Sequence, residues 1–166
     1  MQWLESIADQ AIARKPDEGD EIIVSSGISP SGGYHMGYLR EIIICDAIAR
    51  ALARRGRRVR HLHFVDDQDG FRKVPAGLPE QYQKYLGKPL WDIPAPDGSG
   101  LSYADYSLAD FSGAVEKLGI TMEVIRSHEQ YQSGRFSGAV ELVLRRVKEV
   151  RQVLQDISGR RLDENW

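Results

Sequence analysis

The sequence has a single cysteine, Cys45, so no disulfide can form within the chain. It also has no apolar run near the ~20 residues that a membrane-spanning helix needs. Charged residues recur through residues 1–15, where a signal peptide would have an apolar core. Together, these absences predict a protein of the reducing cytoplasm that does not bind a membrane.

Neither sign of charge is in excess, because 22 lysines and arginines stand against 24 aspartates and glutamates. This balance excludes a uniformly basic nucleic-acid binder of the histone kind, although it allows a local basic face. Hydrophobic residues make up 42% of the chain and charged residues 28%, which is the composition of a globular protein. A chain of 166 residues is the size of one domain and needs no disulfide or metal to stabilise its core.

Strand and helix patterns alternate along the chain. Short β-branched runs predict strands at 21–26, 59–65 and 121–125, and apolar residues at helical spacing predict helices over 2–14, 35–55, 103–118 and 137–157. A strand, a helix and a strand at this spacing form a βαβ unit with parallel strands. The order predicts an α/β fold in which residues 1–166 form one nucleotide-binding domain, the β-α-β-α-β half of a doubly wound, Rossmann-like fold. Prolines and glycines crowd residues 66–102, which favours an irregular insertion there with one short helix near 80–85.

Glycines gather in the turn after the first strand, at Gly27, Gly32, Gly33 and Gly37. A helix follows this turn, and the free N–H groups at a helix start form an anion site. The turn matches neither the GxxxxGK[ST] phosphate loop nor GxGxxG, and it leaves Pro30 followed by His35 at the helix start. An imidazole there can donate a hydrogen bond to an α-phosphate. A glycine-rich loop with a surface histidine is an equally weighted alternative.

Four stretches resemble one family: SGISPSGGYHMGYLREI, VDDQDGFRKVP, LPEQYQKYLGKPLWDIP and LGITMEVIRSHEQYQSGRF. The first is similar to the ATP-binding signature of class I aminoacyl-tRNA synthetases. The four together are similar to class I lysyl-tRNA synthetases over nearly the whole chain. The resemblance implies a nucleotide fold of the HUP type that activates lysine with ATP, taken with Mg²⁺, and transfers it to tRNA.

The resemblance implies roles by position. It places Gly27 and Ser29 in a lysine pocket, and it makes His35 the catalytic residue of the ATP signature. The implied ATP-binding set is Pro30, Gly33, His35, Gly37 and Tyr38. The fourth position of the signature is usually His or Asn in the family, whereas here it is Tyr38, whose phenol has a different reach.

Acidic and basic residues follow the second strand at its carboxyl end, where open α/β sheets bind ligands. Asp66 and Asp67 are expected to bind lysine. The candidate accessory residues are Asp69, Arg72, Lys73 and, in the loop expected after the third strand, His128. The alternatives are Mg²⁺ held jointly with ATP and a capped turn with local ion pairs.

Family members often carry a zinc site in the insertion after an Ile-Pro dipeptide. The matching positions here are Ala95, Ser99, Gly100 and Tyr106, and none of these side chains is a good zinc ligand. We therefore expect no zinc and no other metal site of the chain's own. His61 and His63 lie two residues apart on one predicted strand and form a metal pair or, as we favour, two core histidines.

Arginines cluster at the end of the second helix and on the last helix. The clusters are Arg50, Arg54, Arg55, Arg57, Arg58 and Arg60, and then Arg145, Arg146, Lys148 and Arg151. Either cluster could contact a tRNA backbone. A solvated face is the favoured interpretation of most of these residues.

Two functions remain open. The first is a lysine-activating synthetase domain, either the N-terminal part of a longer enzyme or a short paralogue. The second is a module that binds ATP, lysine or an adenylate, or docks to a partner, without aminoacylation. Tyr38 and the lack of a KMSKS-like loop favour the second, whereas His35, Gly37 and the DDQD segment favour retained ligand chemistry. Because a half-sheet leaves one face and one edge uncovered, we expect association with a second copy or with a complementing half.

Overall fold

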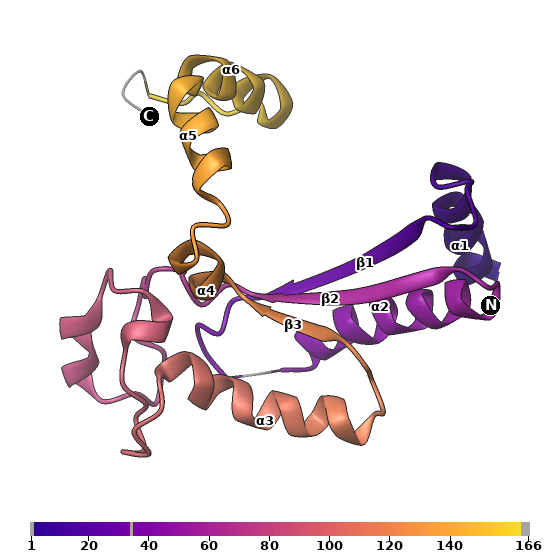
Figure 1. Ribbon diagram of the computed structural model, residues 1–166. Coiled ribbons are helices and arrows are strands. Elements are labelled where there is room, and N and C mark those ends of the chain that lie inside the picture. Colours follow the sequence, from indigo (N-terminus) through magenta and orange to yellow (C-terminus); the bar gives the residue numbers. More distant parts are fainter. Residues whose placement is uncertain (1, 34, 164–166) are drawn as a thin grey trace. The chain divides into compact units, whose positions relative to one another are not determined.

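The computed structural model describes residues 2–33 and 35–163 and contains one parallel sheet (Figure 1). The sheet consists of β1 (Glu21–Ile28), β2 (Arg58–Val65) and β3 (Glu123–Arg126), in the order β1-β2-β3. Between β1 and β2 lies α2 (Met36–Arg54), and α3 (Tyr103–Lys117) leads into β3. The predicted α/β, Rossmann-like arrangement of three parallel strands is confirmed.

The chain divides into two compact units, Met1–His128 and Glu129–Trp166. The first contains the sheet together with α1 (Gln2–Arg14), α2 and α3. The second contains most of α4 (Ser127–Gln132), followed by α5 (Ser137–Arg145) and α6 (Val147–Ser158). No helix in the described parts of the chain is long and apolar enough to cross a membrane.

The single helix expected over 137–157 is wrong, because two helices meet at Arg146. This residue has φ −117° and ψ 30°, and its N–H is shared between the carbonyls of Leu142 and Val143, which tightens the last turn of α5. The stretch has no proline, and one non-helical residue leaves the apolar spacing unchanged, so periodicity does not detect the break. His128, expected in a loop, lies in α4 instead.

Both connecting helices lie on the same side of the sheet (Figure 1). Alternate strand residues point toward them, as the period of two in a strand requires. The core between α2, α3 and the strand ends is formed by Ile28, Ile42, Val65, Leu108, Phe111 and Val115. A second cluster packs α1 against α2 and β1 and consists of Leu4, Ala8, Ile22, Ala51 and Leu52. Burial of these side chains, at about 1.5–3 kcal/mol for each large one, is the main stabilisation of this layer.

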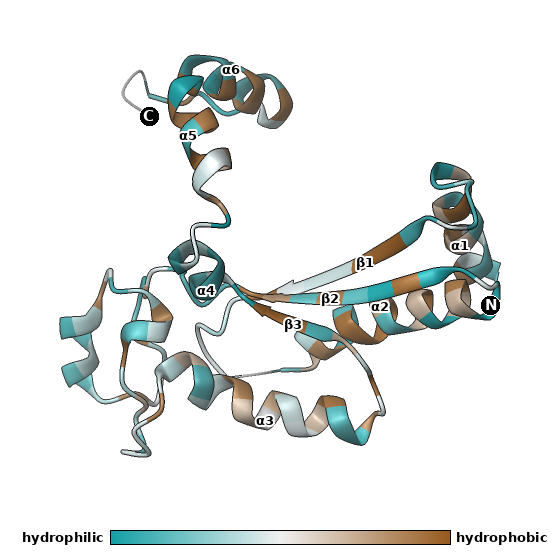
Figure 2. Ribbon diagram, in the orientation of Figure 1, coloured by the Kyte–Doolittle hydropathy of each residue, from teal (hydrophilic) through white to brown (hydrophobic). Residues whose placement is uncertain are grey.

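The other face of the sheet is open. Among the described residues of the first unit, no helix covers it (Figure 1). Ile23 of β1 is 54% exposed, and Arg60 of β2 spans the face to pair with Glu21 and Glu123. Figure 2 shows hydrophobic segments on β1 and β3, the two strands that each have one hydrogen-bonded neighbour. The sheet therefore has an uncovered face and two unpaired edges.

Residues 66–102 form the irregular insertion that the prolines predict. Its helical segments in the described chain are two short 3₁₀ helices, η1 (Glu80–Tyr85) and η2 (Leu90–Asp92). They pack around a small core of their own together with the start of α3: Phe71, Tyr82, Leu90, Ile93, Tyr103 and Ala104. The insertion is thus an ordered excursion that closes on the N-terminus of α3.

A polar group lies on the covered face of the sheet. Ser26 Oγ lies 2.9 Å from His61 Nε2 and 2.9 Å from His63 Nδ1, and both imidazoles are buried. The described residues contain no group of three or more His, Cys, Asp or Glu side chains that could hold a metal. Ser26 therefore connects the two buried histidines of β2 to β1, which is what the favoured interpretation as core histidines expects. Burial, with a smaller contribution from His61, lowers the pKa of His63 to about 4.

We expect acid to destabilise the fold through His63. The unfolded chain binds a proton on this side chain near pH 6.5, whereas the folded chain does so only near pH 4. This contribution to stability is therefore complete above pH 6.5 and is lost as the pH falls from 6.5 to 4, by about 3 kcal/mol in all. Urea unfolding at a series of pH values measures the loss. His63→Asn keeps a partner for Ser26 but does not titrate, so the free energy of unfolding of this variant should fall by about 3 kcal/mol less than that of the wild type over the same pH range. An equal fall in both chains would contradict the assignment to His63.

Candidate active site

The carboxyl ends of the three strands meet at one edge of the sheet. Strand pairing aligns Ile28 with Val65 and Val65 with Arg126, so the residues that follow each strand lie together. Asp66 N donates to Ile28 O at 2.7 Å, and Ser127 Oγ donates to Asp66 Oδ1 at 2.9 Å. These bonds connect the three strand ends directly.

His35 caps the N-terminus of α2. Its Nδ1 accepts a hydrogen bond from Gly37 N at 3.1 Å, so the neutral ring has its proton on Nε2. A Cβ atom at position 37 would lie 2.8 Å from the His35 ring, so a side chain there would displace the ring from its capping position. Tyr38 stacks on the same ring, with 4.3 Å between the centroids. Three of the predicted ATP-binding residues thus meet at this helix start, after a turn in which Pro30 is buried and Gly33 is exposed.

Glu41 is a residue of this edge that the sequence analysis missed. Its Oε1 accepts a hydrogen bond from Gly27 N at 3.0 Å, so a carboxylate lies directly at the predicted lysine pocket. Glu41 follows Gly37 by four residues and therefore lies on the same face of α2. That spacing is the signal that could have identified it.

A cavity of about 400 Å³ lies between the turn after β1 and the start of the insertion. Its lining consists of Ser29, Ser31, Asp69, Gly70, Phe71, Arg72 and Lys73. The structure therefore brings Ser29, predicted for the lysine pocket, together with three of the accessory candidates. Within the described chain, no side chain hydrogen-bonds or pairs with the Asp69 carboxylate, which leaves its charge available to a cation.

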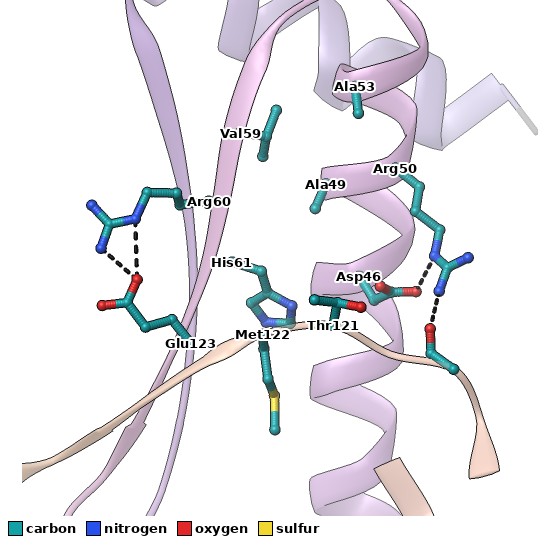
Figure 3. A pocket seen from close by; sticks show the side chains of 11 residues that line it. Asp46, Ala49, Arg50, Ala53, Val59, Arg60, His61, Thr121, Met122 and Glu123 are labelled. Carbon is teal, nitrogen blue, oxygen red and sulfur yellow. Dashed lines mark hydrogen bonds and ion pairs between the residues drawn. The ribbon is translucent and has the colours of Figure 1, made fainter. Parts of the chain in front are cut away.

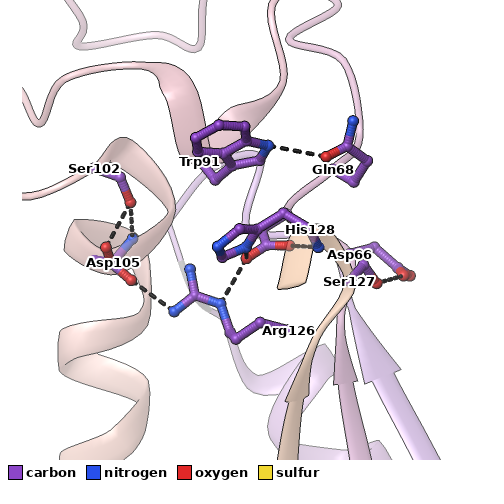
Figure 4. Close-up of polar contacts among 9 residues, drawn as sticks. Asp66, Gln68, Trp91, Ser102, Asp105, Arg126, Ser127 and His128 are labelled. Atoms are coloured by element: carbon purple, nitrogen blue, oxygen red, sulfur yellow. Dashed lines mark hydrogen bonds and ion pairs between the residues drawn. The ribbon is translucent and has the colours of Figure 1, made fainter. Parts of the chain in front are cut away.

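Asp67 lies in a different environment from Asp69. Its side chain is 0% exposed, and it accepts hydrogen bonds from Arg126 Nε at 2.6 Å, from His128 N at 2.9 Å and from His128 Nδ1 at 2.6 Å (Figure 4). Arg126 also donates to Asp105 at 2.6 Å. Burial alone would lower the pKa of Arg126, but the bonds to Asp105 and Asp67 raise it, so the guanidinium stays charged. The Asp67 carboxylate is fully engaged within the chain.

The arginine clusters are paired with groups of the same unit. Arg55 pairs with Glu5 and Asp9, Arg60 with Glu21 and Glu123, Arg50 with Asp46, Arg145 with Glu141, and Arg146 with Glu149. Arg57 is buried and donates to the carbonyls of Lys15 and Asp17. At least five of the ten clustered cations are thus in ion pairs among the described residues, and the interpretation of a solvated face stays a prediction.

A second cavity, of about 480 Å³, lies among α2, the first half of β2 and the approach to β3 (Figure 3). The charged side chains in its lining are bound to one another, Arg50 to Asp46 and Arg60 to Glu123. None of the residues predicted for ATP or lysine lines it. It is therefore separate from the edge that carries His35 and Asp69.

The positions that correspond to zinc ligands in the resembled family differ in burial and in location. Ala95 is buried, whereas Ser99 and Gly100 are exposed in the loop before α3. Tyr106 lines a further cavity, of about 490 Å³, together with Gly33. The expected absence of zinc stays a prediction.

Comparison with known proteins gives a consistent result. The family of tRNA synthetases class I (K) matches residues 1–166. Lysine–tRNA ligase 1 of Methanosarcina acetivorans is 35% identical over 166 residues, and the lysine–tRNA ligases of Archaeoglobus fulgidus and Pyrococcus horikoshii are 36% identical over 166 and 170 residues. Each alignment covers 100% of this chain but only 30%, 33% and 32% of the relative. A Campylobacter jejuni chain solved as a candidate arginyl-tRNA synthetase has a TM-score of 0.41 and 17% identity, with coverage of 89% of this chain and 40% of that one.

Proposed function

This chain belongs to the class I lysyl-tRNA synthetase family, and we propose that it forms the N-terminal part of a catalytic domain that activates lysine with ATP and transfers it to tRNA. The chain spans about a third of the length of the relatives it matches, so activation and transfer are proposals for this chain. The observation that carries the proposal is one sheet edge with both an N-terminal histidine cap and a cavity containing an unpaired carboxylate.

ATP is proposed to bind at the start of α2. With Nδ1 of His35 engaged by Gly37 N, Nε2–H is left to donate to the α-phosphate as negative charge develops on it. Gly37 lets an adenine ring approach the helix backbone, and Tyr38 supports the imidazole by stacking. Pro30 and Gly33 shape the turn, and Mg²⁺ would be held jointly with the phosphates.

Lysine is proposed to bind beside Gly27 and Ser29. The unpaired carboxylate of Asp69 suits the side-chain ammonium, and Glu41, which already contacts Gly27, is a second anionic group at the same edge. Arg72 and Lys73 supply the positive charge that a lysine carboxylate and ATP phosphates require. Asp66 and Asp67, first expected to contact lysine, are proposed to support the pocket, because both carboxylates accept bonds from the start of α4.

The chemistry is attack of the lysine carboxylate on the α-phosphorus of ATP, with pyrophosphate as the leaving group. Such a displacement depends on positioning and charge stabilisation and needs no covalent bond to the protein. A second candidate function is a module that binds ATP, lysine or an adenylate without aminoacylation, in the cytoplasm and without a zinc ion. It is favoured by Tyr38, which stands where the family usually has His or Asn in the ATP signature, and by the internal ion pairs that engage Arg55 and Arg60.

We also propose that the open face of the sheet and the β1 edge associate with a second copy or a complementing half. The argument is the exposure of Ile23, together with the pairing of Arg60 with the carboxylates of Glu21 and Glu123, which leaves no unpaired cation of this group beside Ile23. Unpaired edges without a protecting lysine or proline readily take up another strand.

Lysine-dependent exchange between ATP and pyrophosphate tests the enzymatic proposal. We expect His35→Ala to lower exchange by about 10²–10³-fold, because it removes the donor to the developing charge. His35→Asn is the matched variant, since asparagine still caps the helix but does not place Nε2–H at the phosphate. Normal exchange by His35→Asn would restrict His35 to capping. Binding of ATP or lysine without any exchange by the wild-type chain would favour the binding module.

Asp69→Asn tests the lysine pocket without a change in shape. A hydrogen bond to a charged group contributes about 1.5–3 kcal/mol, so lysine should bind about 10–100-fold more weakly by calorimetry. Norleucine, which lacks the side-chain ammonium of lysine, should bind equally to the wild type and to Asp69→Asn. Asp92→Asn, at an exposed carboxylate outside the cavity lining, is the control and should bind lysine as the wild type does. Equal lysine affinity in Asp69→Asn would exclude Asp69 from recognition.

Light scattering over a concentration series tests association. Ile23→Lys places a charge on the open face and should shift the chain toward the monomer. Val124→Lys is the matched control, because Val124 is 50% exposed but aligns with His63 and so belongs to the covered face. A wild-type chain that stays monomeric at high concentration would contradict the proposal.

A further inference from the structure

We infer that His128 is a positioning residue for the lysine cavity: it holds the Asp66–Asp69 turn through the buried carboxylate of Asp67 and connects that turn to the insertion through Trp91. The inference rests on the proposed lysine site. It assigns a role to a residue that does not line the cavity itself.

The turn that contains Asp69 is held in place through Asp67, near its centre. Asp69 N donates to Asp66 O at 3.2 Å, which closes the turn and leaves Asp67 and Gln68 at its centre. The Asp67 side chain points into the protein, and His128 supplies both a backbone and a ring donor to it, at 2.9 and 2.6 Å. Because an ionised carboxylate only accepts, the His128 proton lies on Nδ1. One residue of α4 therefore engages both oxygens of the carboxylate.

Arg126 does not replace this anchor. Its Nε shares Oδ2 of Asp67 with the His128 ring, and its Nη1 is directed to Asp105 of α3. The Oδ1 atom accepts only from the backbone of His128 among the described residues. Loss of the His128 ring leaves Oδ2 with a single donor in a site without solvent, which favours movement of the turn.

Trp91 attaches the insertion to the same turn (Figure 4). Its ring stacks on the His128 imidazole, with 5.1 Å between centroids and 18° between planes. Its backbone N–H donates to Asp67 O at 3.1 Å, and its Nε1 donates to Gln68 Oε1 at 2.9 Å. Leu90 N donates to Asp69 O at 3.0 Å. The insertion thus hydrogen-bonds to three successive residues of the turn, and His128 contacts the insertion through Trp91 and the turn through Asp67.

The position of the turn determines part of the cavity's geometry. Asp66 N is bonded to Ile28 O, directly before Ser29, and Ser29 and Asp69 line the cavity together. A displacement of the turn therefore changes the separation between the Asp69 carboxylate and the Ser29 side of the pocket. His35 lies at the start of α2, and its hydrogen bond and its ring stack among the described residues go to Gly37 and Tyr38 and not to this turn, so ATP binding should not follow the same change.

Calorimetric titration of the full 166-residue chain with lysine, and separately with ATP, tests the inference. We expect His128→Ala to weaken lysine binding by about tenfold or more and to leave ATP binding unchanged. His128→Asn should recover lysine affinity to within about threefold of the wild type, because its amide can donate to Asp67 from nearly the position of Nδ1. Gln132→Ala, an exposed residue of the same helix, is the control.

Tryptic cleavage of the insertion after Lys84 gives a second readout. Lysine should slow cleavage in the wild type and in His128→Asn but not in His128→Ala, which a general loss of stability would not reproduce. Equal lysine affinity in His128→Ala and the wild type, or failure of His128→Asn to recover while remaining folded by circular dichroism, would overturn the inference alone. No lysine binding by the wild-type chain would instead overturn the proposed function and the inference with it.

Discussion

A single buried negative charge, the carboxylate of Asp67, organises the functional edge of this fold. A carboxylate without exposure to solvent costs several kcal/mol unless its oxygens are hydrogen-bonded and its charge is paired. The donors come from the last residue of β3 and the start of α4, and the peptide groups of the same turn receive the insertion. Arg126 extends the network to α3 through Asp105. Neutralisation of one charge therefore requires β2, β3, α3, α4 and the insertion to converge.

This convergence gives the neighbouring carboxylates of Asp67 and Asp69 different roles. Asp67 is engaged on both oxygens and serves the fold, whereas Asp69, two residues later, lies in the 400 Å³ cavity without a partner among the described residues. The turn places the Asp67 side chain in the protein interior and the Asp69 side chain in the cavity lining. A site that must bind a cation gains from this arrangement, because the free carboxylate is held by a backbone that the buried one has already fixed.

The fold followed from the sequence more fully than the site did. Short β-branched runs located all three strands, and apolar residues at helical spacing located the helices of the first unit, because burial in the core imposes both patterns. Periodicity failed at Arg146, where a single residue leaves helical geometry without disturbing the apolar spacing. The letters DDQD do not say which carboxylate is buried, since the donors that decide it lie 59 and 61 residues further along the chain. Glu41 was missed because its role depends on the contact between α2 and β1.

The uncovered sheet face bears on what this chain can do. Arg60 is paired there with Glu21 and Glu123, so its charge is satisfied within the chain beside the exposed Ile23. At the other end of the same strands, Arg72 and Lys73 are the cations that line the 400 Å³ cavity together with Ser29 and Asp69. The carboxyl edge of an open parallel sheet is where ligands bind, and the groups proposed for ATP and lysine are gathered there. The open face and the unpaired β1 edge are separate from that edge, so they are where another polypeptide can join the sheet.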